Sequence, residues 1–286
     1  MNKIFYLLIL ALLSQACEKE EDLGPSIFDT TAKPLSELDQ WIYSNFVVPA
    51  NMSVEYKWID GDADTQKNLV PPKEELVKPF LEVVKRVWMD VYTQQGGNDF
   101  IKMNSFRRML LVGSASYNNG TITQGTAEGG VQIVLYQVND FNSKNLITLK
   151  RYFHVIHHEY GHILQQKIPI SVDFQSITGK YDANWDDYTD DVAKRMGFIT
   201  AYSISEPNED FVEILATLFT NTKEEWDAKL AEISTGPGDD EGNAAIDKIR
   251  QKEEFVRVYL KTNWGIDVDS FREASMNVIN QVVSGN

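Results

Sequence analysis

The chain has 286 residues, and its 42 aspartates and glutamates outnumber its 27 lysines and arginines, which gives a formal net charge of −15. Because a surface this acidic repels phosphate backbones, we expect no nucleic-acid partner. A single cysteine excludes a disulfide bond within the chain. No repeat or proline-rich linker divides the sequence, so we expect a single domain over residues 34–286.

The N-terminus has the order of a secretory signal. A basic start is followed by ten apolar residues, Ile4 to Leu13, which are too few to span a bilayer. Cys17 then stands where a bacterial lipoprotein carries its lipid. We therefore expect residues 1–16 to be a signal peptide, Cys17 to be lipidated and residues 17–33 to form an acidic tether. The alternative is a plain secretory signal with an incidental cysteine.

The first half of the mature chain is predicted to contain both helices and strands, and the second half mainly helices. The first half holds a helix at 35–46, a strand at 53–58, a helix at 73–93 and strands at 106–117 and 131–136. Glycine-containing turns after residues 117 and 127 favour a small antiparallel sheet for the last two strands. From residue 147 onward the pattern is helical, with helices expected at 147–167, 207–221, 224–234, 243–262 and 268–283. The sequence thus predicts an α+β fold.

All four histidines lie between residues 154 and 162, inside the first of these later helices. His158 and His162 are one turn apart beside the apolar face, so their imidazole nitrogens can reach one zinc ion. Glu159 projects next to them, where its carboxylate can accept a proton from water on that ion. Gly161 is costly in a helix interior, which indicates close approach of another backbone or of a substrate.

Neither of the other two histidines can complete a site with this pair. His154 lies eight residues before His162, or about 12 Å along a helix, which two bonds of about 2 Å cannot span. His157 points about 100 degrees away from His158. Because the mature fold has no further histidine or cysteine, we expect a carboxylate as the third zinc ligand.

Carboxylates at the start of the helix predicted over 207–221 are the candidates. Glu209 and Glu213 are one turn apart, and like charges at this spacing repel each other on a free helix. Binding of zinc by Glu209, and a hydrogen bond from a zinc-bound histidine to Glu213 or Asp210, would offset that repulsion. We take Glu209 as the ligand, although the sequence leaves open whether Glu213 or Asp210 fills that role instead. An ordinary acidic helix start, favoured by the helix dipole, is the alternative.

His158-Glu159-Tyr160-Gly161-His162, followed by Glu209-Asp210-Phe211-Val212-Glu213, resembles the gluzincin class of zinc metallopeptidases. Together with the lipoprotein start and Leu38-Asp39-Gln40-Trp41-Ile42, these segments resemble the zinc-binding metallopeptidase lipoproteins of Bacteroidota, also called substrate import-associated zinc metallohydrolases. The resemblance runs over most of the mature chain, but only the two zinc segments are specific. It implies a zincin-like fold in which residues 34–167 hold the sheet and the active-site helix, and residues 168–286 the helical part with the glutamate ligand.

The same resemblance implies a location and a partner. The acidic run at residues 18–22 resembles the export signal of surface lipoproteins, so the expected place is the outer membrane, with the lipid anchor as the sole membrane contact. Members of the family are encoded near TonB-dependent transporters and their partner lipoproteins, which implies a role in nutrient capture. Tyr202, seven residues before Glu209, matches a tyrosine that steadies the oxyanion in lethal-factor-type gluzincins.

We therefore expect hydrolysis of peptide bonds by zinc-activated water, with Glu159 as general base and Tyr202 as oxyanion donor. Residues 131–136 are expected to form an edge strand that pairs with an extended peptide or protein substrate. The alternative is a surface lipoprotein that binds peptide or glycan without cleaving it, through aromatic residues such as Trp185 and Tyr188. Glu159 favours the enzyme, because a structural zinc site does not need a free carboxylate beside the metal.

Overall fold

A computed structural model of the protein describes residues 34–57, 67–118, 121–123, 125–128 and 131–285. The chain divides into two units, Met1–Ser36 and Glu37–Asn286, and the second unit contains the helices and strands of the described residues. The predicted signal peptide, Cys17 and the acidic tether up to residue 33 lie outside those residues. Among the described helices, none is both long enough and apolar enough to cross a membrane.

Two of the predicted helices are interrupted by π-helical turns. The first predicted helix comprises α2 (Glu37–Ile42), a π-helical turn (Tyr43–Val47) and α3 (Val48–Ala50). The second comprises α4 (Glu74–Val84), a π-helical turn (Lys85–Met89) and α5 (Asp90–Gly96), and α6 (Phe100–Asn104) follows it. The apolar periodicity thus located both helices, although it could not indicate the local change of hydrogen-bond spacing.

The sheet is mixed, so the predicted antiparallel sheet is wrong. Its strands, in spatial order, are β1 (Ser53–Glu55), β2 (Arg108–Leu111), β6 (Gln132–Leu135) and β5 (Gly125–Glu128). The first three strands run parallel, and only β5 is antiparallel to its neighbour β6. The cause is the connection between β2 and β6, which contains three further strands and returns the chain in its original direction.

Two further expectations about the strands are corrected. The run predicted as one strand over 106–117 is split into β2 and β3 (Ser116–Asn118), and β3 pairs only with β4 (Thr121–Thr123) in a separate two-stranded sheet. The predicted edge strand, β6, is paired on both sides, by β2 and by β5. The edge position nearest α7 therefore belongs to β5.

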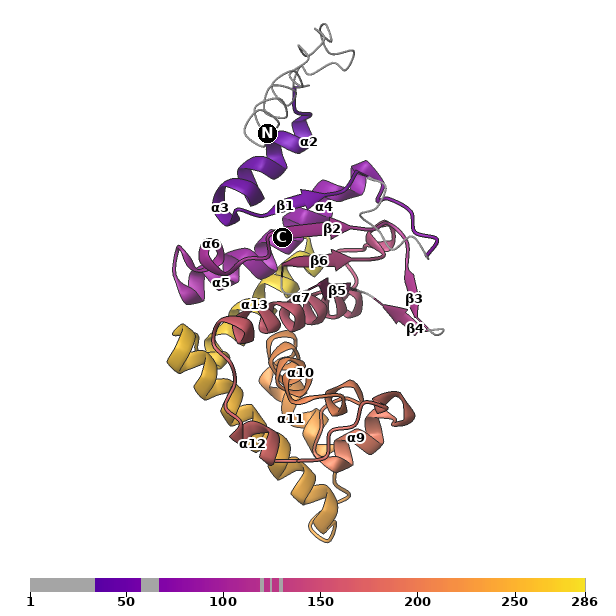
Figure 1. Cartoon of the computed structure of the whole chain (residues 1–286), viewed down its shortest axis with the longest axis vertical. Helices are drawn as coiled ribbons and strands as arrows, with labels where there is room; N and C mark the ends of the chain where they lie inside the picture. Colours follow the sequence, from indigo (N-terminus) through magenta and orange to yellow (C-terminus); the bar gives the residue numbers. More distant parts are fainter. Residues whose placement is uncertain (1–33, 58–66, 119–120, 124, 129–130, 286) are drawn as a thin grey trace, which may run out of the picture. The chain divides into compact units, whose positions relative to one another are not determined.

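The five helices predicted for the second half are confirmed, and two short ones are added. In chain order these elements are α7 (Leu146–Lys167), α8 (Asp173–Ser176), α9 (Asp190–Met196), α10 (Pro207–Thr220), α11 (Lys223–Ala231), α12 (Asp240–Trp264) and α13 (Val268–Ser284). Figure 1 shows the strands on one side of α7 and α10 on the other. The two helices that carry the predicted zinc residues thus pack against each other.

Buried aromatic side chains fix the rotation of α7. Tyr160 is fully buried, and its ring meets those of Tyr92 and Trp88 edge to face at centroid distances of 4.5 and 5.3 Å. Such pairs add about 0.5–1.5 kcal/mol each beyond the burial of their area. Because Tyr160 is held on the core side of α7, the histidines at 158 and 162 face α10.

Gly161 marks the closest approach of the two helices. A Cβ atom at this position would lie 2.7 Å from Cγ1 of Val212 and 3.1 Å from its Cβ. The glycine therefore accommodates a side chain of α10, where the sequence had indicated a backbone or a substrate.

Replacing Gly161 by alanine is expected to destabilise the protein by a net amount of about 1 kcal/mol. Overpacking costs about 1–3 kcal/mol, and the gain in helix propensity returns up to about 1 kcal/mol. Urea unfolding of Gly161→Ala alone and combined with Val212→Ala measures this, because the second change removes the clashing methyl groups. If Gly161→Ala alone stabilised the protein, the helices would not approach as closely as described.

Candidate metal centre

Three side chains from α7 and α10 converge on one point. Nε2 of His158 lies 2.9 Å, and Nε2 of His162 lies 3.2 Å, from the same oxygen, Oε2 of Glu209. The two histidines are one turn apart on α7, and Glu209 lies in the first turn of α10. The structure therefore brings together the three residues that the sequence proposed as zinc ligands.

The remaining nitrogen of each imidazole has an acceptor of its own. Nδ1 of His158 lies 2.8 Å from Oε1 of Glu213, and Nδ1 of His162 lies 3.1 Å from Oε1 of Gln165. Gln165 in turn donates to the carbonyl oxygen of Asn208 at 3.3 Å. An acceptor at Nδ1 keeps the proton there, so the lone pair of Nε2 is directed at the shared point.

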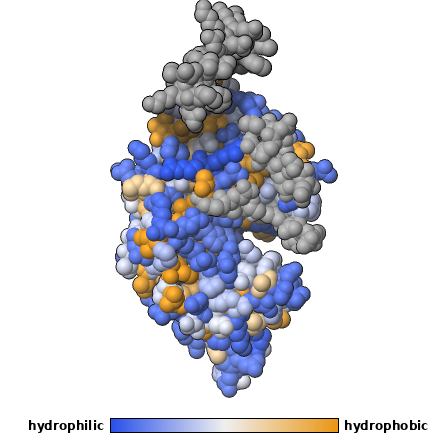
Figure 2. All heavy atoms as spheres, viewed as in Figure 1, coloured by the Kyte–Doolittle hydropathy of each residue, from blue (hydrophilic) through white to orange (hydrophobic). Residues whose placement is uncertain are grey.

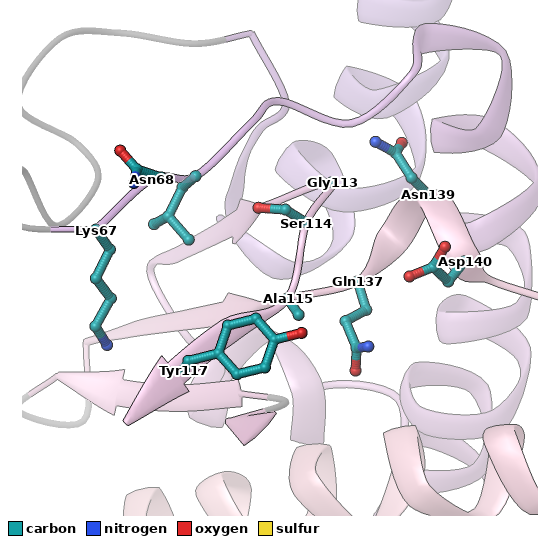
Figure 3. A pocket seen from close by; sticks show the side chains of 10 residues that line it. Lys67, Asn68, Gly113, Ser114, Ala115, Tyr117, Gln137, Asn139 and Asp140 are labelled. Carbon is teal, nitrogen blue, oxygen red and sulfur yellow. The ribbon is translucent and has the colours of Figure 1, made fainter. Parts of the chain in front are cut away.

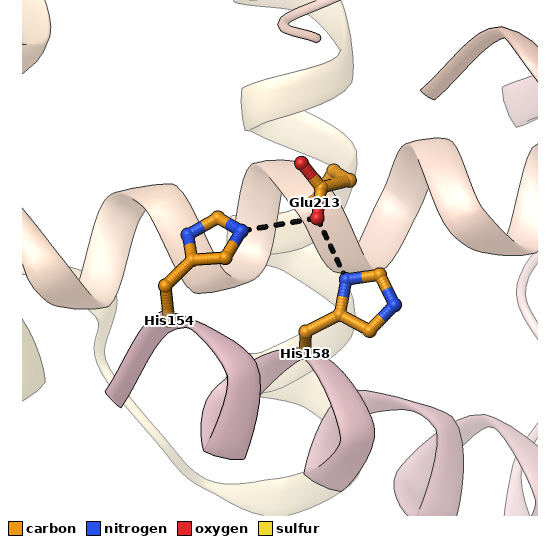
Figure 4. A group of neighbouring side chains, drawn as sticks. All are labelled: His154, His158 and Glu213. Atoms are coloured by element: carbon orange, nitrogen blue, oxygen red, sulfur yellow. Dashed lines mark hydrogen bonds and ion pairs between the residues drawn. The ribbon is translucent and has the colours of Figure 1, made fainter. Parts of the chain in front are cut away.

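Glu213 is a buried carboxylate with more than one partner. Its Oε1 is also 3.0 Å from Nε2 of His154, and Thr200 donates its hydroxyl to Oε2 at 2.9 Å. Figure 4 shows His154 and His158 both pointing from α7 at this carboxylate on α10. Glu213 thus takes the supporting role that the sequence offered to either Glu213 or Asp210.

Asp210 points away from the histidines, which settles that alternative against it. Its Oδ2 lies 2.6 Å from Nζ of Lys252 on α12 and accepts a hydrogen bond from Tyr181 at 2.9 Å. Both Asp210 and Lys252 are completely buried. Burial raises the pKa of Asp210 to about 6, and Lys252 only partly opposes this. Asp210 therefore locks α10 to α12 and does not support a zinc ligand.

The electrostatics of the site favour a cation at the shared point. Burial would raise the pKa of Glu209, but hydrogen bonds with His158 and His162 outweigh it and lower that pKa to about 2. Burial would likewise lower the pKa of His158, but Glu209 and Glu213 outweigh it and raise that pKa to about 10. The two carboxylates thus favour the protonated form of His158, and its Nε2 must give up a proton before it can bind a metal ion.

These residues fit a zinc ion. Two imidazole nitrogens and one carboxylate oxygen form a donor set that zinc takes in catalytic sites, where a fourth position stays open. Two groups among the described residues could hold a metal: His158 with Glu159 and His162, and His154 with His158 and Glu213. Glu209 contacts both Nε2 atoms directly, so it forms a further candidate set of ligands with His158 and His162.

The two predicted catalytic side chains lie beside this point. The carboxylate of Glu159 comes within 4.8 Å of ligand atoms of His158 and His162. The ring of Tyr202 is centred 5.8 Å from that of His158, and the residue is 37% exposed. Burial, followed by the charges of Glu209 and Glu159, raises the pKa of Tyr202 above its usual value, so its hydroxyl keeps its proton at neutral pH.

The aromatic residues suggested for a binding surface are partly buried. Trp185 packs edge to face on Tyr202 at 4.9 Å between ring centroids, and Tyr188 donates its hydroxyl to Asp182 at 3.0 Å. Both contact a small cluster around Phe198. Trp185 therefore supports the ring of Tyr202, and both aromatic side chains keep only part of their surface exposed.

His157 belongs to the core. It is fully buried, with its ring against Phe219 and Phe271, and burial lowers its pKa to about 3. Its surroundings are those of a packed core residue.

Four supporting residues were missed: His154, Gln165, Thr200 and Lys252. The first two carried a local signal, because they lie one turn before His158 and one turn after His162 on the same helix. Thr200 and Lys252 reach the site only through tertiary packing.

The cavity found among the described residues lies away from the predicted zinc residues. Figure 2 shows the surface hollowed at the right edge of the view, below the position of β4 in Figure 1. That cavity, of about 720 Å³, is lined by residues 67–69, 113–115, 117, 137, 139 and 140, which include no predicted zinc residue (Figure 3). The cavity therefore gives no evidence about the metal centre.

Comparison with known proteins gives the chain a family. Residues 31–269 match the family described as "Putative zinc-binding metallo-peptidase". The structure is similar to the crystal structure of a protein of that same description from Bacteroides caccae, with a TM-score of 0.76 and 33% sequence identity over 91% of this chain and 97% of that chain. No curated protein matches the sequence. Because the family match covers most of its length, the chain belongs to this family of zinc-binding metallopeptidases.

Proposed function

We propose that the protein hydrolyses peptide bonds with a zinc ion held by His158, His162 and Glu209. The observation that carries this proposal is the convergence of both Nε2 atoms on one oxygen of Glu209, at 2.9 and 3.2 Å. Glu159 comes within 4.8 Å of the ligand atoms of both histidines, and we propose that it stays outside the ligand set because Glu209 contacts both Nε2 atoms. This surplus carboxylate favours hydrolysis over a structural metal site.

Each side chain then has a distinct task. Zinc supplies Lewis-acid activation of water and of the scissile carbonyl when it is bound. Glu159 accepts the proton of the attacking water and passes it to the leaving amine. Glu213 and Gln165 keep the Nδ1 protons of His158 and His162 in place, so the imidazoles hold their orientation throughout.

Tyr202 is proposed to donate its hydroxyl proton in a hydrogen bond to the oxyanion. Replacing it by phenylalanine is expected to lower kcat about 10²-fold and to leave KM nearly unchanged, because the contact forms only as negative charge develops. Steady-state kinetics on one peptide substrate measures this, with Tyr188→Phe as the matched control. An unchanged kcat would restrict Tyr202 to packing against Trp185.

An extended substrate is proposed to pair with β5. Among the strands of the described residues, β5 pairs only with β6, and it lies next to α7, where a Cβ atom at Gly125 would be 2.3 Å from Cγ1 of Val155. Val155 is one turn before Glu159 on α7. A peptide added along the free edge of β5 would therefore pass near Glu159.

The proposed place of action is the outer surface of the outer membrane. The leader-like first 16 residues and Cys17 support a lipid anchor as the sole membrane contact. The resemblance to Bacteroidota lipoproteins supports nutrient capture beside a TonB-dependent transporter and its partner lipoprotein. Globomycin treatment of expressing cells tests the anchor, because blocked signal removal requires a lipidated Cys17, whereas Cys17→Ser should abolish lipid incorporation.

Cleavage of a diverse peptide library, read by mass spectrometry, tests the activity itself. The zinc-free protein should cleave nothing, and the same sample with zinc restored should cleave peptides with a common pattern around the cut bond. If the zinc-loaded protein, with one zinc confirmed per chain, cleaved no peptide, the result would contradict the proposed hydrolysis and favour a binding lipoprotein.

A further inference from the structure

Glu213, the carboxylate that holds His158, is itself held by two other side chains. Its Oε1 lies 2.8 Å from Nδ1 of His158 and 3.0 Å from Nε2 of His154. Its Oε2 accepts the hydroxyl hydrogen bond of Thr200 at 2.9 Å. Since its side chain is only 8% exposed, water cannot easily replace any of these donors.

This arrangement removes the rotational freedom of the carboxylate. One oxygen can accept two hydrogen bonds through its two lone pairs, so His158 and His154 can both donate to Oε1. With Thr200 on the other oxygen, rotation of the carboxylate would break a hydrogen bond at each end. Without that restraint, Nδ1 of His158 could lose its acceptor, and the imidazole could adopt the other tautomer or turn away.

We propose that His154 is a positioning residue of the metal centre. It donates Nε2–H to Glu213 and so, together with Thr200, keeps the proton of His158 on Nδ1 and the lone pair of Nε2 available for the ion. His154 does not itself bind that ion. This inference rests on the zinc site of the proposed function. It adds His154 as a residue that holds Glu213, which in turn holds the ligand His158.

The same three side chains could alternatively hold a second metal ion. The distances of 2.8 and 3.0 Å suit hydrogen bonds between nitrogen and oxygen, but the distances at Glu209 are similar, so the choice depends on the atoms that a second ion would need. A second ion would also need Nδ1 of His158 as a ligand, which requires the loss of the proton that Glu213 accepts. The geometry therefore points to one ion per chain, with His154 as a donor.

Two measurements on purified, zinc-loaded protein test this without any cleavage assay. The first is zinc affinity by competition with a chromophoric chelator, together with the zinc content per chain. The second is nitrogen NMR of labelled histidine, which identifies the protonated nitrogen of each ring. Four histidines in the chain make assignment by single variants feasible.

The variants separate positioning from packing. His154→Leu should weaken zinc binding about tenfold, at the lower end of the range for outer partners of a metal ligand, and should shift part of His158 to the other tautomer. His154→Gln keeps an N–H donor and should stay within about twofold of the wild type. Thr200→Val removes the opposite donor and should act in the same direction as His154→Leu, which keeps the test valid if the leucine variant does not fold.

The possible results distinguish a positioning role of His154 from a second metal site and from the absence of a zinc site. Unchanged affinity and an unchanged His158 tautomer in both His154→Leu and Thr200→Val would overturn the positioning role while leaving the zinc site intact. Two zinc ions per wild-type chain, reduced to one in His154→Leu, would overturn it in favour of a second metal site. No zinc binding by the wild type would overturn the proposed function and this inference together.

Discussion

Replacing Glu159 by glutamine is expected to lower kcat/KM for peptide cleavage about 10²–10⁴-fold while one zinc per chain is retained. The amide keeps the size of the side chain but cannot accept the proton of water, and general-base catalysis contributes a factor of this size. The proposed ligands stay untouched, because Glu209 is the carboxylate that lies within 2.9 and 3.2 Å of the two Nε2 atoms. Steady-state kinetics with a peptide found by library profiling, together with metal analysis of the same samples, measures both quantities.

The matched control is Glu254→Gln, at an exposed position of α12. It makes the same chemical change far from α7 and should leave kcat/KM within about twofold of the wild type, as is usual for surface changes. If Glu159→Gln kept most of the activity, another group would have to take the proton. If it lost the zinc instead, Glu159 would be a ligand and the assignment of Glu209 would be wrong.

Replacing Lys252 by methionine is expected to destabilise the protein by about 3–5 kcal/mol at pH 8, the cost of leaving one charge of a buried pair alone. Lys252 and Asp210 are both fully buried, 2.6 Å apart, and they join α12 to α10 next to Glu209. Urea unfolding with the exposed Lys229→Met as control measures the loss.

The pH dependence of that loss identifies Asp210 as its source. Burial already raises the pKa of Asp210 to about 6 with Lys252 present, and removal of the lysine raises the pKa further. A carboxyl group with a raised folded-state pKa favours folding below its unfolded value, and this advantage disappears as pH rises through the folded value. The variant should therefore be much closer to the wild type at pH 5 than at pH 8. An equal loss at both values would assign the effect to packing of the lysine stem.

The two helices that carry the proposed zinc ligands could be predicted from the sequence because their signals are local. Apolar residues at steps of three and four marked the buried face of α7, and the same periodicity placed His158 and His162 on a neighbouring face. Elimination indicated a carboxylate as the third ligand, since no histidine or cysteine remained, but Glu209 was only the preferred choice among Glu209, Glu213 and Asp210. The structure brings these three side chains to one point.

The rotation of α10 could not be predicted. Asp210 and Glu213 both lie near the start of this helix, and the sequence did not determine which of them faces α7. The choice is made by Lys252, a buried partner on α12 that draws Asp210 to the opposite side. A contact between residues so distant in sequence leaves no periodic signal in either helix.

The sheet was mispredicted for a related reason. Its strands have three or four residues each, too few for alternation to reveal which neighbours pair. The apolar runs Met109–Leu111 and Ile133–Leu135 were found as strands, but they pair in parallel across an intervening segment that contains β3, β4 and β5. Parallel pairing depends on the path of that connection, which turn residues alone did not reveal.

Anomalous diffraction at the zinc absorption edge, from crystals of the zinc-loaded protein, tests the central claim most directly. The account predicts one strong peak about 2.0–2.2 Å from Nε2 of His158, Nε2 of His162 and a carboxylate oxygen of Glu209, with Glu159 beside it but unbound. A peak between His154 and Glu213, or a zinc ion held by Glu159 in place of Glu209, would contradict it.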